Sequence, residues 1–132
     1  MKFMLIVHHD EEDFNKIEKE KRQQMLAESI ELTHQLHAGG QYLSASPLHP
    51  AETAVIVRVR EGKPLVTDGP FIETREQIAG YFLIQARNLH EAIDIAGKVP
   101  GARIGTVEVR PLIEITGLPK TVSAKCCGLN AE

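Results

Sequence analysis

The chain has 132 residues, of which 42% are hydrophobic and 25% charged, and its formal net charge is −3. This length and composition are those of one soluble, globular domain, and the weak negative charge provides no basic surface of the kind that binds nucleic acid. No apolar run reaches the roughly 20 residues that cross a bilayer, so no membrane association is expected. The only cysteines, Cys126 and Cys127, are too few for a disulfide framework, and we expect a cytoplasmic protein.

The first part of the chain predicts a strand, a helix and a second strand. Residues 2–8, KFMLIVH, form a continuous apolar run that is typical of a buried strand. Residues 16–38 predict an amphipathic helix that ends at the glycine pair after Ala38. The apolar stripe expected on this helix contains Met25, Leu26, Ile30, Thr33 and Leu36. A short strand is expected at residues 41–46, followed by a loop bounded by prolines.

The second part of the chain predicts a hairpin, a strand, a helix and a closing strand. Residues 53–60, TAVIVRVR, alternate between apolar and polar, and the turn EGKP leads into a further strand, LVTDG. Strands are also expected at residues 79–86 and 105–112. Between these two, NLHEAIDIAGKV has apolar residues at helical spacing, and Asn88 with Glu91 resembles the capping pair at the start of a helix.

This order of elements predicts an α+β fold of the ferredoxin-like type, βαββαβ with an extra hairpin. Both helices would cover one face of the sheet, and no helix is left for the other face. We therefore expect a homodimer in which a partner's sheet covers the second face. The domain is expected to span residues 1–116, and residues 117–132 to form a mobile C-terminal tail.

Strand alternation divides the side chains of the sheet between two faces. The face toward the helices is expected to be uniformly apolar, with Phe3, Leu5, Val7, Val55, Val57, Val59, Phe82, Ile84, Val107 and Val109. The opposite face mixes apolar and polar side chains, among them Met4, Ile6, His8, Ile56, Arg58, Arg60, Tyr81, Leu83, Gln85, Thr106, Glu108 and Arg110. Small-molecule pockets have this mixture, so the candidates for binding a small polar or anionic ligand are His8, Arg58, Tyr81, Glu108 and Arg110. The alternative is a dimer interface without a ligand, in which the arginines pair with Glu108.

The histidines and cysteines do not predict a metal site. His8 and His9 are consecutive strand residues, so their side chains point to opposite faces and cannot easily bind one ion. His34 and His37 lie at the end of the predicted first helix, where a positive charge interacts favourably with the helix dipole. The sequence has no zinc-type spacing, P-loop or dinucleotide-binding glycine motif, so we expect neither metal nor cofactor.

The stretch VTDGPFIET, residues 66–74, contains Asp68, whose carboxylate is the candidate for a catalytic role. An Asp-Gly step makes a turn in which the carboxylate accepts backbone N–H groups, and Pro70 stiffens it. On this interpretation Asp68 is partly buried and bonded to its own turn, and Phe71 anchors the loop by burying its ring. The alternative keeps the turn but directs Asp68 into an inter-subunit cleft, where it would act as a base.

Together, KFMLIVHHDE, VRVREGKPLVTDGPF, GYFLI and GTVEVRPL closely resemble the YCII-related domain family. The branch it resembles is named for the motif at Asp68, Gly69, Pro70 and Phe71, and the likeness extends to about Leu112. The resemblance implies a dimeric α+β barrel, formed by two ferredoxin-like sheets packed face to face. Relatives in that superfamily include muconolactone isomerases and a chloromuconolactone dehalogenase. The DGPF branch is associated with sigma factors of the extracytoplasmic-function type.

The resemblance also implies an acid–base pair made by a histidine on the first helix and an aspartate. This chain has Ser29 near the expected place of that histidine, and His34 and His37 lie out of its register. One function that follows is a homodimer with a ligand-binding cleft between its subunits and metal-free chemistry of lyase, isomerase or dehalogenase type, with Asp68 as the base. The alternative is a non-catalytic regulatory or interaction module that works with a sigma factor.

Overall fold

A computed structural model of the chain describes residues 1–119. The elements in chain order are β1 (Lys2–Asp10), α1 (Glu11–Lys16), α2 (Lys19–Ala38), β2 (Tyr42–Pro47), the 3-10 turn η1 (Ala51–Thr53), β3 (Val55–Arg60), β4 (Lys63–Asp68), β5 (Glu76–Gln85), α3 (Leu89–Ala96), α4 (Gly101–Ile104) and β6 (Thr106–Pro111). The expected succession of strands and long helices is confirmed, with the short helices α1 and α4 added to it.

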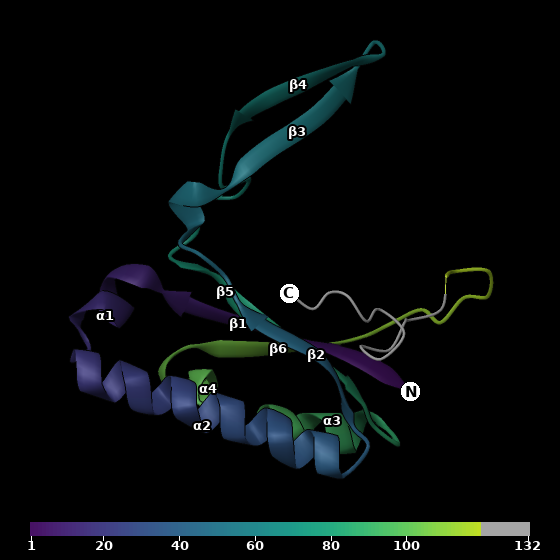
Figure 1. Cartoon of the computed structure of the whole chain (residues 1–132). Helices are drawn as coiled ribbons and strands as arrows, with labels where there is room; N and C mark the ends of the chain where they lie inside the picture. The colour runs from purple at the N-terminus through teal and green to yellow at the C-terminus, as the bar shows by residue number, and fades with distance from the viewer. Residues whose placement is uncertain (120–132) are drawn as a thin grey trace, which may run out of the picture.

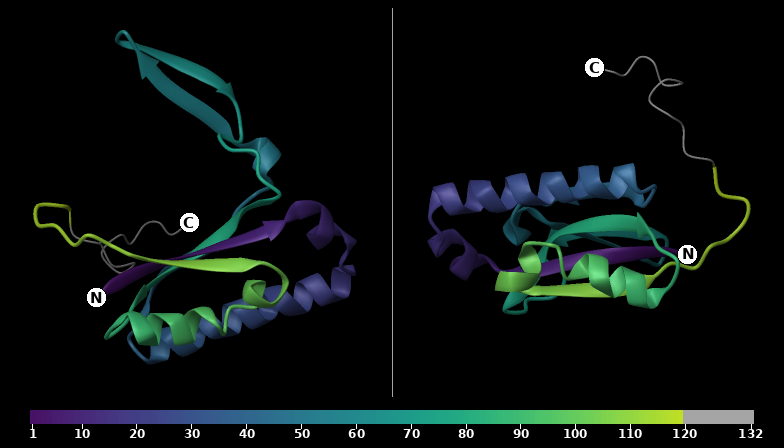
Figure 2. Two further views of the ribbon diagram at one scale, coloured as in Figure 1. Left: turned by 180° about the vertical axis from the view of Figure 1, so that it is seen from behind. Right: turned by 90° about the horizontal axis from the view of Figure 1, so that it is seen from below.

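The body of the domain is a four-stranded antiparallel sheet with the order β2-β5-β1-β6. The helices α2 and α3 lie against one face of this sheet, and no helix of residues 1–119 covers the other face (Figures 1 and 2). The protein therefore has an α+β fold, a four-stranded antiparallel sheet plus a hairpin. We call the uncovered side, which contains Met4, Ile6, Tyr81 and Leu83, the open sheet face.

The core lies between the sheet and the helices. Alternation along β1 and β5 buries every second side chain, as the sequence predicted. The buried hydrophobic side chains are Phe3, Leu5, Val7, Leu32, Leu36, Phe82, Ile84, Ala86, Ala92, Ile95, Ala96 and Val99. Val107 and Val109 of β6 pack against this core as partly buried residues, so their predicted placement is also confirmed.

The apolar stripe of α2 is buried in its second half only. Leu32 and Leu36 are buried, whereas Leu26 is 50% exposed and Ile30 is 49% exposed. The prediction that one stripe packs along the whole helix is therefore wrong for these two residues. Side chains from the first half of α2 line a cavity beneath the sheet instead of filling it.

The strands β3 and β4 form a separate two-stranded hairpin, here called the arm, that is not hydrogen-bonded to the four-stranded sheet. The arm projects on the side of the sheet opposite the helices (Figure 1). The placement of Val55, Val57 and Val59 in the core is consequently wrong, since they are 59%, 62% and 62% exposed. The predicted hairpin turn is present, and Glu61 and Gly62 both have positive φ, as a tight two-residue turn requires.

The helix α3 begins with the cap that the sequence predicted. The Asn88 side chain accepts the backbone N–H of Glu91 at 2.9 Å. In a complete capping box the Glu91 carboxylate would accept the backbone N–H of Asn88. Here it accepts the backbone N–H of Arg87 at 2.8 Å instead, and it also binds the Arg87 side chain. One half of the expected capping box is thus present, and its second half is shifted by one residue.

Within residues 1–119, no helix is long and apolar enough to cross a membrane. Most of the predicted mobile tail, residues 120–132 with Cys126 and Cys127, lies outside the described residues.

Candidate functional site

A cavity of about 310 Å³ lies between α2, the sheet and α4, and we call it the helix–sheet cavity. Its walls are mainly apolar, and include Met25, Leu26, Ile30, Phe82, Val99 and Ile104. Ligand pockets are concave and mostly apolar, with a few polar groups that fix the orientation of the ligand. The polar residues here include His9, Arg22 and Ser29.

The local structure at the end of β1 builds one side of the helix–sheet cavity. Alternation places His9 on the helix side of the sheet, and Asp10 caps α1 by accepting the N–H of Asp13 at 3.1 Å. The turn into α1 brings Phe14 onto His9, with their rings stacked at a centroid distance of 4.4 Å and an angle of 21°. The Arg22 guanidinium lies 5.8 Å from the centre of the Phe14 ring, within cation–π range.

Burial controls the electrostatics of this group of side chains. Desolvation lowers the pKa of His9, and the nearby carboxylates of Glu11, Glu76 and Asp10 oppose this effect only in part. The imidazole is therefore neutral at pH 7 and can accept a proton. The Nε of Arg22 is buried and has no hydrogen-bond partner within residues 1–119.

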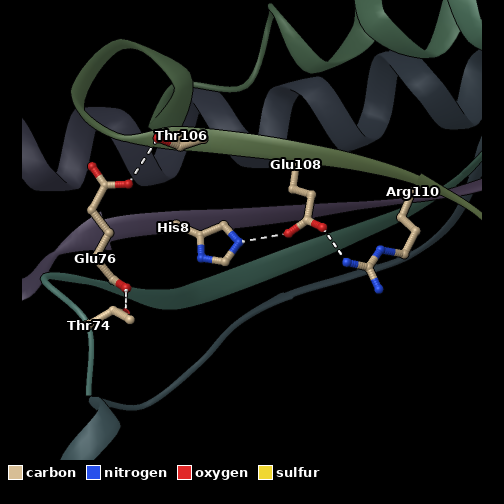
Figure 3. Close-up of polar contacts among 6 residues, drawn as sticks. All are labelled: His8, Thr74, Glu76, Thr106, Glu108 and Arg110. Atoms are coloured by element: carbon tan, nitrogen blue, oxygen red, sulfur yellow. Dashed lines mark hydrogen bonds and ion pairs between the residues drawn. The ribbon is translucent and has the colours of Figure 1, made fainter. Parts of the chain in front are cut away.

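A second group of polar side chains lies on the open sheet face (Figure 3). His8 Nε2 is 3.2 Å from a carboxylate oxygen of Glu108, whose other oxygen binds the Arg110 guanidinium. Arg110, followed by His8, holds the pKa of Glu108 below its usual value. The backbone register explains the cluster, because β1 and β6 are paired and these side chains share one face. Tyr81 is on the same face, with its hydroxyl 3.1 Å from the Ser44 hydroxyl.

The DGPF segment lies at the end of the arm nearer the sheet. Asp68, Arg58 and Phe71 line an open concavity of about 380 Å³, and the Arg58 guanidinium lies 5.3 Å from the centre of the Phe71 ring. The Gly69–Pro70 peptide bond is cis, and Gly69 donates its N–H to the carbonyl of Ala54 at 2.8 Å.

Two expectations for this segment are wrong in the single chain. Asp68 is exposed, and within the described residues its carboxylate accepts no hydrogen bond from the turn. Phe71 is also exposed, so its ring does not anchor the loop in the core. The reason is the same for both, because the arm projects from the domain and leaves its own turn without a buried environment.

The sequence candidates thus divide into two groups on different elements. His8, Glu108 and Arg110 meet on the open sheet face, and Arg58 and Asp68 line one concavity on the arm. Sequence reasoning missed His9 and Arg22, which line the helix–sheet cavity. A signal for both exists, because His9 follows the alternation of the buried β1 residues. Arg22 precedes Met25, Leu26 and Ser29 at the i, i+3, i+4, i+7 spacing of one helix face.

Among residues 1–119, no three His, Cys, Asp or Glu side chains are arranged so that they could hold a metal ion. The expectation that the protein needs no metal or cofactor stays a prediction.

The fold and the cavity define a small α+β domain with a helix-covered sheet, a projecting arm and an apolar pocket between helix and sheet. A model of the YCII-related domain matches residues 1–116 of the chain. The chain is also similar to a protein of Rhizobium meliloti (strain 1021) that is described as uncharacterized protein R00369. The two are 31% identical over 114 residues, which cover 85% of this chain and 92% of the relative. The chain belongs to the YCII-related domain family, as its sequence motifs indicated.

Proposed function

We propose that this YCII-related protein binds a small molecule in the helix–sheet cavity. The observation that carries the proposal is the cavity itself, whose volume of about 310 Å³ lies at the lower end of the range for ligand pockets. Its wall is mainly apolar, while Arg22 and His9 supply polar groups at one side. Ser29 also lines the cavity, and it stands near the place where relatives are thought to have an acid–base histidine.

The chemistry that suits this site is proton transfer without a metal. A general base needs a free lone pair and a pKa close to the working pH. The His9 imidazole has a free lone pair at neutral pH, because desolvation keeps its pKa below the ordinary value, and its ring stacks on Phe14 at the cavity wall. A reaction of lyase or isomerase type, which begins by removing a proton next to a carbonyl, fits this base. Asp68 lies on the arm, so it is a candidate base only for a cleft shared with a partner subunit.

The test is a thermal-shift screen of a metabolite library with the unaltered protein and two variants. Ser29→Phe fills the helix–sheet cavity, and Asp68→Asn alters the arm without touching the cavity. We expect ligands that raise the melting temperature of the unaltered protein to fail with Ser29→Phe and to succeed with Asp68→Asn. If the ligands raise the melting temperature of Ser29→Phe but not that of Asp68→Asn, they bind at the arm and the open sheet face instead of in the helix–sheet cavity. Turnover is then sought with His9→Gln, which should retain binding and lose any proton exchange.

The protein is further proposed to be a homodimer of the α+β barrel type, built through the open sheet face. Met4, Ile6 and Leu83 lie on this face, and no helix covers it (Figures 1 and 2). The arm stands on the same side, so a partner's sheet would contact both the open sheet face and the arm. In such a dimer Asp68 and Arg58 of the arm would border an inter-subunit cleft.

A second function, an interaction module for a sigma factor, is favoured by one observation on the arm. Its exposed apolar side chains, Val55, Val57, Val59, Leu65 and Val66, exceed what a solvated hairpin needs, and such patches mark protein contacts. The test is direct binding to extracytoplasmic-function sigma factors of the same organism, compared between the unaltered protein and Val57→Glu. Loss of binding in the variant would support this function. Equal binding by both proteins, or none by either, would count against it.

A further inference from the structure

Arg22 differs from the other arginines of the domain in its surroundings. Four arginines, Arg75, Arg87, Arg103 and Arg110, form ion pairs with a carboxylate. Arg22 forms no ion pair within residues 1–119, yet it lines an apolar cavity and its Nε is buried. Burying a polar group without a partner costs free energy, so the unsatisfied Nε–H of Arg22 at the cavity indicates a missing acceptor.

The charge of the cavity wall restricts what that acceptor can be. Among the residues that line the helix–sheet cavity there is no aspartate or glutamate, so nothing on the wall neutralises Arg22. The guanidinium lies within cation–π range of the Phe14 ring, on which His9 also stacks. Since desolvation lowers the pKa of His9, the cavity carries a single positive charge at neutral pH.

On the basis of the proposed function, we infer that the ligand is a small carboxylic acid with an apolar body, whose carboxylate accepts hydrogen bonds from Arg22. A guanidinium binds a carboxylate through two parallel N–H groups, and these hydrogen bonds are strong in an apolar environment. One positive charge on the cavity wall matches one carboxylate, whereas a phosphate dianion would keep a second negative charge unpaired on that wall. The mainly apolar wall of α2 and the sheet receives the rest of the molecule.

The inference is tested with matched pairs of probes that differ only in charge. Phenylacetate is compared with phenylacetamide, and hexanoate with hexanamide, by isothermal titration calorimetry at neutral pH. For the unaltered protein we expect each carboxylate to bind at least about tenfold more tightly than its amide. Equal affinities within a pair would overturn the inference, and so would the absence of binding by all four probes.

Three variants assign the preference to Arg22. Arg22→Gln should weaken the carboxylates about tenfold or more and leave the amides unchanged. Arg22→Lys keeps the charge without the Nε donor and should restore part of the loss. The control is Lys21→Gln, which removes the neighbouring positive charge from the exposed side of the same helix and should leave all four affinities unchanged. An equal loss with Lys21→Gln would mean that the preference reflects the overall charge, and this would overturn the inference.

Ser29→Phe separates this inference from the proposed function. If it abolishes binding of both members of a pair while Arg22→Gln affects neither, the cavity is a ligand site but Arg22 does not recognise a carboxylate. If Ser29→Phe leaves all binding intact, the probes bind elsewhere and the proposed function fails together with the inference. Melting temperatures of all variants show whether each is folded before its affinities are compared.

Discussion

The surroundings of a titratable side chain decide its chemical role more than the motif in which it stands. Asp68 belongs to the DGPF motif, yet it is exposed and its carboxylate accepts no bond from its own turn within the described residues. His9 belongs to no recognised motif, yet it stacks on Phe14 at the wall of the helix–sheet cavity. For His9 the structure leads to a prediction about the pH dependence of stability, and for Asp68 to a prediction about the effect of a substitution on stability.

His9 should make the stability of the protein depend on pH in a narrow window. Its pKa in the folded chain is below 6.5, the ordinary value that applies to the unfolded chain. At a pH between the folded and the unfolded pKa, the unfolded chain therefore binds more protons than the folded chain. The free energy of unfolding should therefore fall as the pH drops below about 6.5, and level off once folded His9 is also protonated. Urea denaturation between pH 7.5 and 5 measures this decrease.

His9→Gln removes the group and should lessen that decrease. The control is His49→Gln, which removes an exposed histidine that forms no ion pair within residues 1–119 and should leave the pH dependence as it is. Unchanged pH dependence in His9→Gln would show that burial does not disfavour the charged imidazole. The four carboxylates with lowered pKa values, Asp10, Glu28, Glu91 and Glu108, lose their favourable contacts only at lower pH and do not interfere.

Asp68→Asn should leave the stability of the fold almost unchanged. The side chain is exposed and holds no backbone group in the turn, so we expect a change within about 0.5 kcal/mol, as for other surface substitutions. Chemical denaturation of the unaltered protein and the variant at the same concentration measures it. A loss of about 1 kcal/mol, typical of a removed cap, would instead show that the carboxylate does support its turn.

At the scale of elements, α2 has two halves with different tasks. The C-terminal part anchors the helix through Leu32 and Leu36, while Arg22, Met25 and Ser29, which come earlier in the helix, line the cavity. A helix that is held at one end can carry an unfilled pocket at the other. Its apolar stripe is therefore not a uniform packing surface.

A pair of leucine substitutions distinguishes the two halves of α2. Leu36→Ala should cost about 2–5 kcal/mol, as for other leucines removed from a core. Leu26→Ala should cost about 1 kcal/mol or less, because half of this side chain is already exposed. Denaturant unfolding of the two variants gives both values. Similar losses would indicate that the first half of the helix is packed as tightly as the second.

The sequence predicted the elements well, because their periodicity is local. The alternation in β1 and β5 and the Asn88 cap of α3 are properties of neighbouring residues, and all are present in the structure. The position of the arm is not local. VIVRV alternates in the same way whether it joins a sheet or leaves it, so Val57 was assigned to a core that it does not reach.

The candidate site was predictable only in part for the same reason. Alternation shows that His8 and His9 point to opposite faces, and the structure agrees, since His8 binds Glu108 and His9 stacks on Phe14. Which of the two faces contains a cavity depends on how α2 lies on the sheet. The position of α2 on the sheet depends on packing between elements far apart in the chain, and a local sequence pattern does not predict such packing.

At the scale of the whole molecule, the open sheet face should determine the oligomeric state. We expect sedimentation velocity at micromolar concentration to show a dimer, because Ile6 and Leu83 would otherwise remain on a sheet face that no helix covers. Leu83→Glu places a charge in that interface and should yield a monomer. The matched control, Leu89→Glu, alters an exposed leucine of α3 and should remain dimeric. A stable monomer of the unaltered protein would contradict the dimer.

The strand order described above also bears on how newly made chains avoid aggregation. Four strands have a free edge in the single chain, β2 and β6 in the sheet and β3 and β4 in the arm. Three of them contain a proline, namely Pro47, Pro111 and Pro64, and β3 contains Arg58 and Arg60. Proline offers no N–H group to an incoming strand, and charged side chains disfavour stacking of strands on one another. Growth of fibrils from the edges is thereby hindered while the open sheet face remains free to associate.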